Sequence, residues 1–304
     1  MTGSRPSPGG ATRSSRIVVG VDACPVSWIA VRWAATLAGW LDAEVIAAHG
    51  LRPDLPRADV PAASIGAQVA FTLERDWCAP LRAAAVPYRL VVREGSPVDV
   101  LQQVVETEAP ELVVTGRHTG AQERGWRSTS LGMLASPHVP TLVVPEPTPE
   151  AAMAAPLGGR DVAVRRILVG IDGSAPSLRA LDWAVRLAGA SGGDIVAVST
   201  IEEVPVFPLG PATVVSSEGE ADAPARAAVM LARACAPARA RGAHVHTISR
   251  RGPPATVLVR MATLLHADLV AAGIRGLGRP DHPTLGHVSR RLVCRSPRPV
   301  LLTP

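Results

Sequence analysis

The chain has 304 residues, a length that favours two domains over one. Hydrophobic residues make up 47% of it and charged residues 19%, and this composition excludes a disordered, collagen-like or coiled-coil chain. The formal net charge is +5, but the 31 basic residues, all arginine, are scattered and form no basic stripe, so nucleic-acid binding is disfavoured.

Apolar runs are short throughout. None approaches the roughly 18 apolar residues that a membrane helix needs, and the run after the Ser/Gly/Pro/Arg-rich start is too short for a signal peptide. We therefore expect a soluble, cytoplasmic protein without a membrane partner.

The four cysteines lie far apart, without a C-x-x-C spacing: Cys24, Cys78, Cys235 and Cys294. This spacing argues against a zinc ribbon or a dithiol redox motif and favours small buried hydrophobic residues. Cys24 stands at an expected helix start, where the pKa of a thiol can be lowered, so a redox role for it stays open. We predict no metal site.

The chain contains one pattern twice. The segment Arg16–Asp22, R-I-V-V-G-V-D, recurs 150 positions later as Arg166–Asp172, R-I-L-V-G-I-D. Gly116 matches Gly273, now 157 positions apart, so the copies differ by a short insertion. We predict a tail, a first domain, a Pro/Ala/Gly-rich linker and a second domain at 1–15, 16–146, 147–164 and 165–304.

Within the first copy, short apolar runs alternate with longer helical stretches. The expected strands are 16–21, 44–49, 86–92, 111–115 and 140–144, and the expected helices are 26–40, 66–85, 97–107 and 128–136. Pro80 and its counterpart Pro237 should end or kink the second helix of each copy. Because the strands are almost uniformly apolar, helices should cover both faces of the sheet. The predicted fold class is α/β, with two tandem doubly wound domains, each a five-stranded parallel sheet flanked by helices.

In such a sheet, ligands bind beyond the carboxyl ends of the strands, where the strand order reverses. Asp22 and Asp172 follow the first strand of each copy. A carboxylate there can accept a hydrogen bond from a ligand, or it can cap the helix that follows. Local sequence leaves both interpretations open.

A glycine-rich loop follows the fourth strand of the second copy and contains Gly273, Gly276 and Gly286. Glycines let backbone N–H groups approach a phosphate, and the next helix adds the positive end of its dipole. A glycine-rich loop after a strand is also often only a turn, so the spacing alone is weak support.

Both copies resemble the universal stress protein domain, and the whole chain resembles a tandem universal stress protein of the kind common in GC-rich actinobacteria. The residues that carry the resemblance are the two V-G-[VI]-D openings, Glu94–Pro97, Arg251–Pro254 and the loop before each closing strand. Family members that bind ATP share a G-x-x-G-x9-G-(S/T) motif. The resemblance implies that this loop holds the phosphates and ribose, and that the Asp after strand one meets the adenine.

Carried over by position, the second copy keeps the three glycines and departs from the motif at His287, where the family has Ser or Thr. An imidazole can still donate a hydrogen bond to a phosphate. The binding residues that the resemblance implies in this copy are Asp172, Gly173, Gly273, Gly276, Gly286, His287, Val288 and Ser289.

The first copy is expected to be degenerate. Thr119 takes the place of the second glycine, with Gly120 beside it, and Arg127 takes the place of the third. The positions that remain are Asp22, Gly116 and Ser128. Arg127 could instead offer its charge to a phosphate.

The resemblance thus implies a stress-response regulator or sensor that binds ATP, with or without Mg²⁺, mainly in the second copy. It also implies that the copies pair through their last strands, and it is compatible with a homodimer and with an unidentified protein partner. One alternative is a nucleotide-independent interaction module, which His287 and the degenerate loop of the first copy favour. Another is a slow ATP hydrolase using Asp281 and His282, although a chain without lysine has no Walker-type lysine. We predict no catalytic residues.

Overall fold

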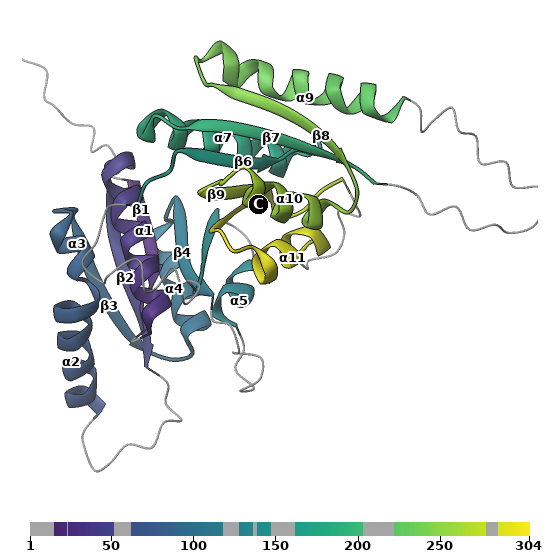
Figure 1. Ribbon diagram of the computed structural model, residues 1–304. Coiled ribbons are helices and arrows are strands. Elements are labelled where there is room, and N and C mark those ends of the chain that lie inside the picture. The colour runs from purple at the N-terminus through teal and green to yellow at the C-terminus, as the bar shows by residue number, and fades with distance from the viewer. Residues whose placement is uncertain are drawn as a thin grey trace, which may run out of the picture.

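Ten strands form one continuous sheet in the order β3-β2-β1-β4-β5-β10-β9-β6-β7-β8 (Figure 1). The computed structural model describes residues 15–22, 24–51, 62–117, 128–135, 139–146, 162–202, 222–277 and 285–304. Within each half of the sheet all neighbouring strands are parallel. The structure confirms the predicted fold class of two doubly wound α/β domains.

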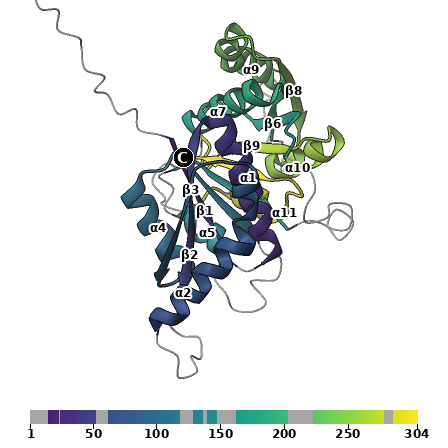
Figure 2. The ribbon, with the colours of Figure 1, turned by 90° about the vertical axis from the view of Figure 1, so that its left-hand side faces the viewer.

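Domain 1 supplies the first five strands. Its elements are β1 (Ser15–Gly20), α1 (Pro25–Leu41), β2 (Ala43–Leu51), α2 (Ala62–Thr72), a π-helical turn η1 (Leu73–Trp77), α3 (Ala79–Ala83), β3 (Tyr88–Glu94), α4 (Pro97–Glu108), β4 (Leu112–Arg117), α5 (Thr129–Ala135) and β5 (Thr141–Pro145). Figure 2 shows α4 on one side of these strands and α1 on the other.

The single helix predicted at 66–85 is divided into α2, η1 and α3. The interruption lies at Cys78, and Pro80 occupies the first turn of α3, where its missing N–H is not needed. The predicted break is therefore confirmed in domain 1, and proline begins the new helix there.

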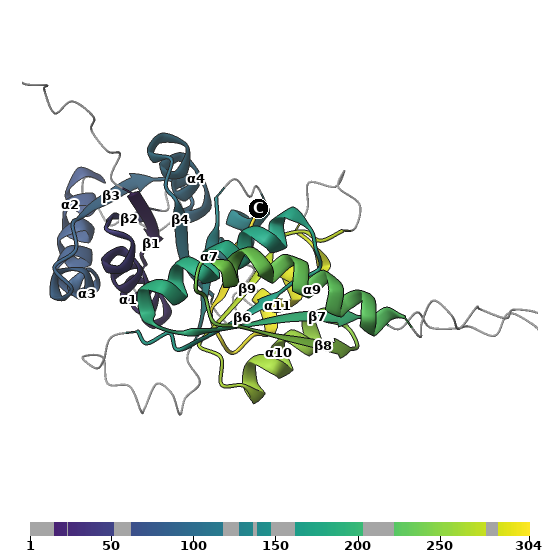
Figure 3. The ribbon, with the colours of Figure 1, turned by 90° about the horizontal axis from the view of Figure 1, so that it is seen from above.

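Domain 2 repeats the order with β6 (Arg166–Gly170), α7 (Ala175–Ser191), β7 (Asp194–Ile201), α9 (Ala223–Ala240), β8 (Val245–Arg251), α10 (Pro254–Leu264), β9 (Leu269–Gly273), α11 (His287–Arg295) and β10 (Val300–Thr303). Helices α7 and α9 cover one face of the sheet and α10 and α11 the other (Figures 1 and 3). Here α9 continues through Pro237, which does not end it. Because Pro237 has no N–H, α9 loses one backbone hydrogen bond, to the carbonyl of Arg233.

The two domains join through their last strands, as the resemblance implied. β5 and β10 pair antiparallel, with Val143 opposite Val300. Leu134 of α5 and Val143 lie in one buried apolar cluster with Leu292 and Val300 of domain 2. Burying one such side chain contributes about 1.5–3 kcal/mol. The hydrophobic core therefore runs across the boundary between the domains.

A cap built around the Asp after strand one begins the first helix of domain 2. Ser174 is the N-cap of α7, and its hydroxyl accepts from the Ser177 N–H at 3.3 Å. The same hydroxyl donates to Asp172 Oδ1 at 2.6 Å, and the Ser174 N–H donates to that oxygen at 2.9 Å. Asp172 therefore orders the turn that starts α7, besides any role toward a ligand.

Cys24 has the same position in domain 1. Its sulfur accepts from the Ser27 N–H at 3.3 Å and donates to Asp22 Oδ1 at 2.5 Å. Burial of the thiol, helped by the Asp22 carboxylate, raises the pKa of Cys24 to about 12. The protonated thiol is therefore favoured at this helix start, because desolvation and an adjacent anion both disfavour the thiolate.

An arginine at or near the start of the first strand makes the same kind of contact in both domains. Arg16 donates to the Glu108 carbonyl at the end of α4 at 3.1 Å, and Arg166 donates to the Leu265 carbonyl just after α10 at 2.6 Å. A cation at a helix C-terminus satisfies unpaired carbonyls and interacts favourably with the dipole. In each domain this arginine fixes the helix that precedes the fourth strand, α4 or α10, against the first strand.

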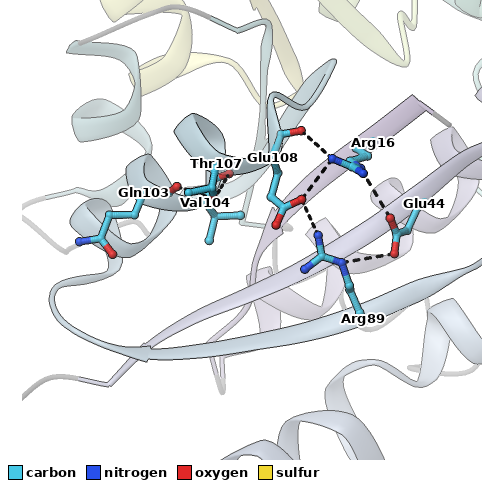
Figure 4. A network of polar contacts seen from close by, with 7 residues as sticks. All are labelled: Arg16, Glu44, Arg89, Gln103, Val104, Thr107 and Glu108. Atoms are coloured by element: carbon cyan, nitrogen blue, oxygen red, sulfur yellow. Dashed lines mark hydrogen bonds and ion pairs between the residues drawn. The ribbon is translucent and has the colours of Figure 1, made fainter. Parts of the chain in front are cut away.

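In domain 1 the contact extends into a four-residue network (Figure 4). Arg16 and Arg89 both contact Glu108 Oε2, at 3.2 and 2.6 Å. Arg89 also contacts Glu44 Oε1 at 3.3 Å. The network ties β1, β2 and β3 to the end of α4, and the hydrogen bond from Arg89 is the main cause that lowers the pKa of Glu108.

We expect Glu108→Gln to lower the free energy of unfolding at pH 7 by less than about 1 kcal/mol, because these ion pairs are partly exposed. A carboxyl whose pKa is lowered on folding stabilises the protein above its ordinary pKa and loses that effect as the pH falls through the lowered value. The difference between wild type and variant in urea unfolding should shrink as the pH falls from neutrality to about 3. Glu106→Gln, on an exposed side of α4, is the control. A difference that does not change with pH would contradict the network.

Iodoacetamide at about pH 8 should modify Cys294 before the other cysteines, because alkylation needs a thiolate. Cys294 is exposed, whereas burial and Asp22 raise the pKa of Cys24 to about 12 and burial raises those of Cys78, to about 11, and Cys235. Peptide mass spectrometry over a time course measures the order. Cys24→Ser, which copies Ser174, should fold normally. Labelling of Cys24 ahead of Cys294 would refute this account of the cap.

Candidate functional site

The loops that follow β6 and β9 meet at the carboxyl edge of domain 2. A Cβ added to Gly276 would lie 2.4 Å from Asp172 Oδ2, closer than van der Waals contact allows. Asp172 Oδ1 is already held by Ser174. The carboxylate therefore bridges the turn before α7 and the glycine loop after β9, two segments about a hundred residues apart in sequence.

The other two glycines of the motif also lie where the chain has no room for a side chain. A Cβ on Gly273 would lie 2.9 Å from the Ser177 nitrogen, and one on Gly286 would lie 2.7 Å from the Ile274 carbonyl oxygen. The Gly286 N–H donates to that oxygen at 3.2 Å. These approaches bring the starts of α7 and α11 together around the end of β9.

Helix α11 begins at this loop without a side-chain cap. Its N-cap is Gly286, and none of the described side chains bonds to its first-turn amides. The first turn contains no acidic residue, His287 is exposed, and Val288 packs on the core. Unpaired N–H groups together with the positive end of a helix dipole attract an anion such as a phosphate.

The Ser289 hydroxyl makes contacts within the chain. The residue is 2% exposed, and its hydroxyl lies 2.9 Å from the Gly273 carbonyl oxygen and 2.7 Å from that of Ile274. Ser130 of domain 1 repeats the contact, donating to the Gly116 carbonyl at 2.7 Å. In both domains this hydroxyl links the last helix to the carboxyl end of the fourth strand. The family motif did not predict this contact.

In domain 1 the predicted residues are only partly assembled. Asp22 is in contact with Cys24, and a Cβ on Gly116 would lie 3.0 Å from Val26 Cγ1. The Ser128 hydroxyl accepts from the Leu131 N–H at 3.4 Å, at the start of α5. Thr119, Gly120 and Arg127 lie outside the described residues, as do Asp281 and His282 of domain 2.

The carboxyl edge of domain 1 contains a cavity of about 50 Å³ that sequence reasoning missed. Thr115 lines it, is 2% exposed, and its hydroxyl has no hydrogen-bond partner among the described residues. His49 also lines it, with Nδ1 2.6 Å from the Val21 carbonyl oxygen. At the matching position to Thr115, domain 2 has Ala272. The carboxyl edges of the two domains therefore differ in polarity at this position as well as in the number of motif glycines.

A larger groove of about 700 Å³ opens beside Asp172, between α7 and α9. It begins at Gly173, and its lining is mainly apolar with two arginines, Arg226 and Arg233. This volume is in the range of small-molecule sites. Its lining residues are Gly173, Leu178, Asp222, Ala225, Arg226, Val229, Met230, Arg233 and Ala234.

In the described part of the chain, no helix is both long and apolar enough to cross a bilayer. The same residues contain no group of three His, Cys, Asp or Glu side chains arranged to hold a metal ion.

Comparison with known proteins identifies the fold. The chain superposes on a universal stress protein from Archaeoglobus fulgidus DSM 4304 with a TM-score of 0.67 and 18% identity over 95% of both chains. A functionally unknown protein from Pseudomonas aeruginosa PAO1 gives 0.63 and 13%, covering 95% of this chain and 92% of that one. A universal stress protein solved in complex with cAMP is 30% identical over 46% of this chain and 97% of its own, with a TM-score of 0.35. A search of curated protein sequences gives no match.

The model of the universal stress protein family matches twice, over residues 14–145 and 163–304. Together these matches span nearly the whole chain. The chain therefore belongs to the universal stress protein family and contains two of its domains in tandem.

Proposed function

We propose that this protein binds an adenine nucleotide, ATP, mainly in domain 2, and acts as a cytoplasmic stress-response regulator or sensor. The observation that carries the proposal is the convergence of Asp172 and the motif glycines on the uncapped start of α11. Domain 1 lacks this arrangement among its described residues, so we infer one nucleotide per chain.

The residues present fit the parts of such a ligand. The N–H groups of His287 and Val288 would meet the phosphates, with the helix dipole favouring their negative charge. The glycines let the loop approach the start of α7 closely, and Asp172 Oδ2, beside Gly276, would accept a hydrogen bond from the base. Mg²⁺ would come with the nucleotide, since it is held mainly by phosphate oxygens and water.

A nucleotide-independent interaction module is the second candidate. It is favoured by the contacts that Asp172 Oδ1 and the Ser289 hydroxyl already make within the chain, and by the imidazole at position 287. ATP hydrolysis has less support. It requires a group that orients the attacking water, and the two residues considered for that role lie outside the described chain.

Gly276→Val should weaken ATP binding at least about tenfold, because the new side chain would displace the Asp172 carboxylate and the loop. The nucleotide would then lose the charge-assisted hydrogen bonds that these groups make with it. Isothermal titration with ATP, AMP and cAMP in the presence of Mg²⁺ measures the loss and ranks the three ligands.

Gly189→Ala is the matched control for that substitution. Gly189 lies within α7, and a Cβ there would meet nothing within 4 Å. This variant should bind like the wild type and be slightly more stable, since alanine favours the helix. Unchanged ATP affinity in Gly276→Val, with the protein folded, would refute the assignment of the site.

A further inference from the structure

Arg117 of domain 1 reaches across the domain boundary to α11 of domain 2. It is the last residue of β4, and its Nη1 donates to the carbonyl oxygen of Val293 in the last turn of α11. The guanidinium is partly buried, and this burial is the main cause that lowers the pKa of Arg117, against the attraction of Glu146. Its hydrogen bond goes to the Val293 carbonyl of the helix.

The contact is well placed to hold a helix. The last carbonyls of a helix have no partner within it, and a cation at that end interacts favourably with the dipole. The neighbouring Leu292 carbonyl is satisfied by the Ser296 N–H at 2.8 Å, which leaves Val293 to Arg117. Helix α11 has nine residues and spans about 13 Å, so fixing one end constrains the other. That other end is the glycine loop of domain 2.

The pseudo-symmetry of the chain shows that the fold does not need an arginine here. The residue of domain 2 that matches Arg117 is Ile274, which is 1% exposed. Ile274 lies in the same buried cluster as Leu134, the residue of α5 that matches Val293. One side of the boundary is therefore closed by apolar packing, and the other by a partly buried arginine on a helix carbonyl.

We propose that Arg117 is a positioning residue for the nucleotide site of the other domain, fixing α11 so that its first-turn amides stand ready for the phosphates. The proposal rests on nucleotide binding by domain 2. It gives domain 1 a part in that site, because Arg117 directly follows Gly116 at the end of β4, where the degenerate loop begins. A change in that loop would then alter nucleotide affinity in domain 2.

The test compares Arg117→Met, Arg117→Lys and Arg186→Met with wild type. Arg186 is the matched control because it also crosses the domain boundary, pairing with Glu111, but has no contact with α11 among the described residues. We expect Arg117→Met to weaken ATP binding about fivefold or more, at the low end of coupling between sites. Arg117→Lys should restore part of the loss, and Arg186→Met should stay within about twofold of wild type.

Equal affinities for Arg117→Met and wild type, or equal losses in Arg117→Met and Arg186→Met, would overturn the proposal. Hydrogen exchange of residues 287–296 provides a readout that needs no ligand: Arg117→Met should speed it more than Arg186→Met does. If wild type binds no adenine nucleotide, the proposed function fails, and the exchange comparison alone decides whether Arg117 holds α11. Should Arg117→Met not fold, the same comparison is made with Arg117→Gln.

Discussion

The antiparallel pairing of β5 with β10 is the contact on which the rest of this structure depends. It turns two parallel sheets into one sheet of ten strands and lets the apolar cluster around Leu134 and Leu292 run through both domains. Because the pair lies on a pseudo-two-fold axis, it also sets the carboxyl end of the fourth strand of each domain against the last helix of the other, through Arg117 and Ile274. The sites of the two domains are thus built next to a shared boundary, so neither is structurally independent.

The carboxyl edges of the two domains differ in sequence at equivalent positions. In domain 2, close approach of Gly276 to Asp172 and of Gly286 to Ile274 draws the starts of two helices around the end of β9. In domain 1, Thr115 and His49 line a small cavity at the same edge, and the arginine after Gly116 is directed to α11. We interpret this as a division of roles in which domain 2 receives the nucleotide and domain 1 supports it.

The repeat and the apolar strands made the fold and the strand positions predictable, and the family resemblance implied that the last strands pair. The motif also singled out Gly273, Gly276 and Gly286, and each lies where an added Cβ would be too close to neighbouring atoms. The uses of Ser289, Cys24 and Arg117 were not predictable, because each depends on a partner that only the folded chain supplies: backbone carbonyls, a neighbouring carboxylate and the helix of another domain. The cavity at Thr115 was missed because a threonine at the end of an apolar strand looks like ordinary strand sequence.

The most direct measurement is to denature the purified protein and to identify and quantify the adenine nucleotide released per chain, with an ATP titration of the nucleotide-free protein alongside. We expect one equivalent of adenine nucleotide per chain, either carried through purification or bound in the titration. Two equivalents would contradict the degenerate state of domain 1. Absence of any nucleotide, together with no binding of ATP in the presence of Mg²⁺, would contradict the central claim and leave a nucleotide-independent interaction module.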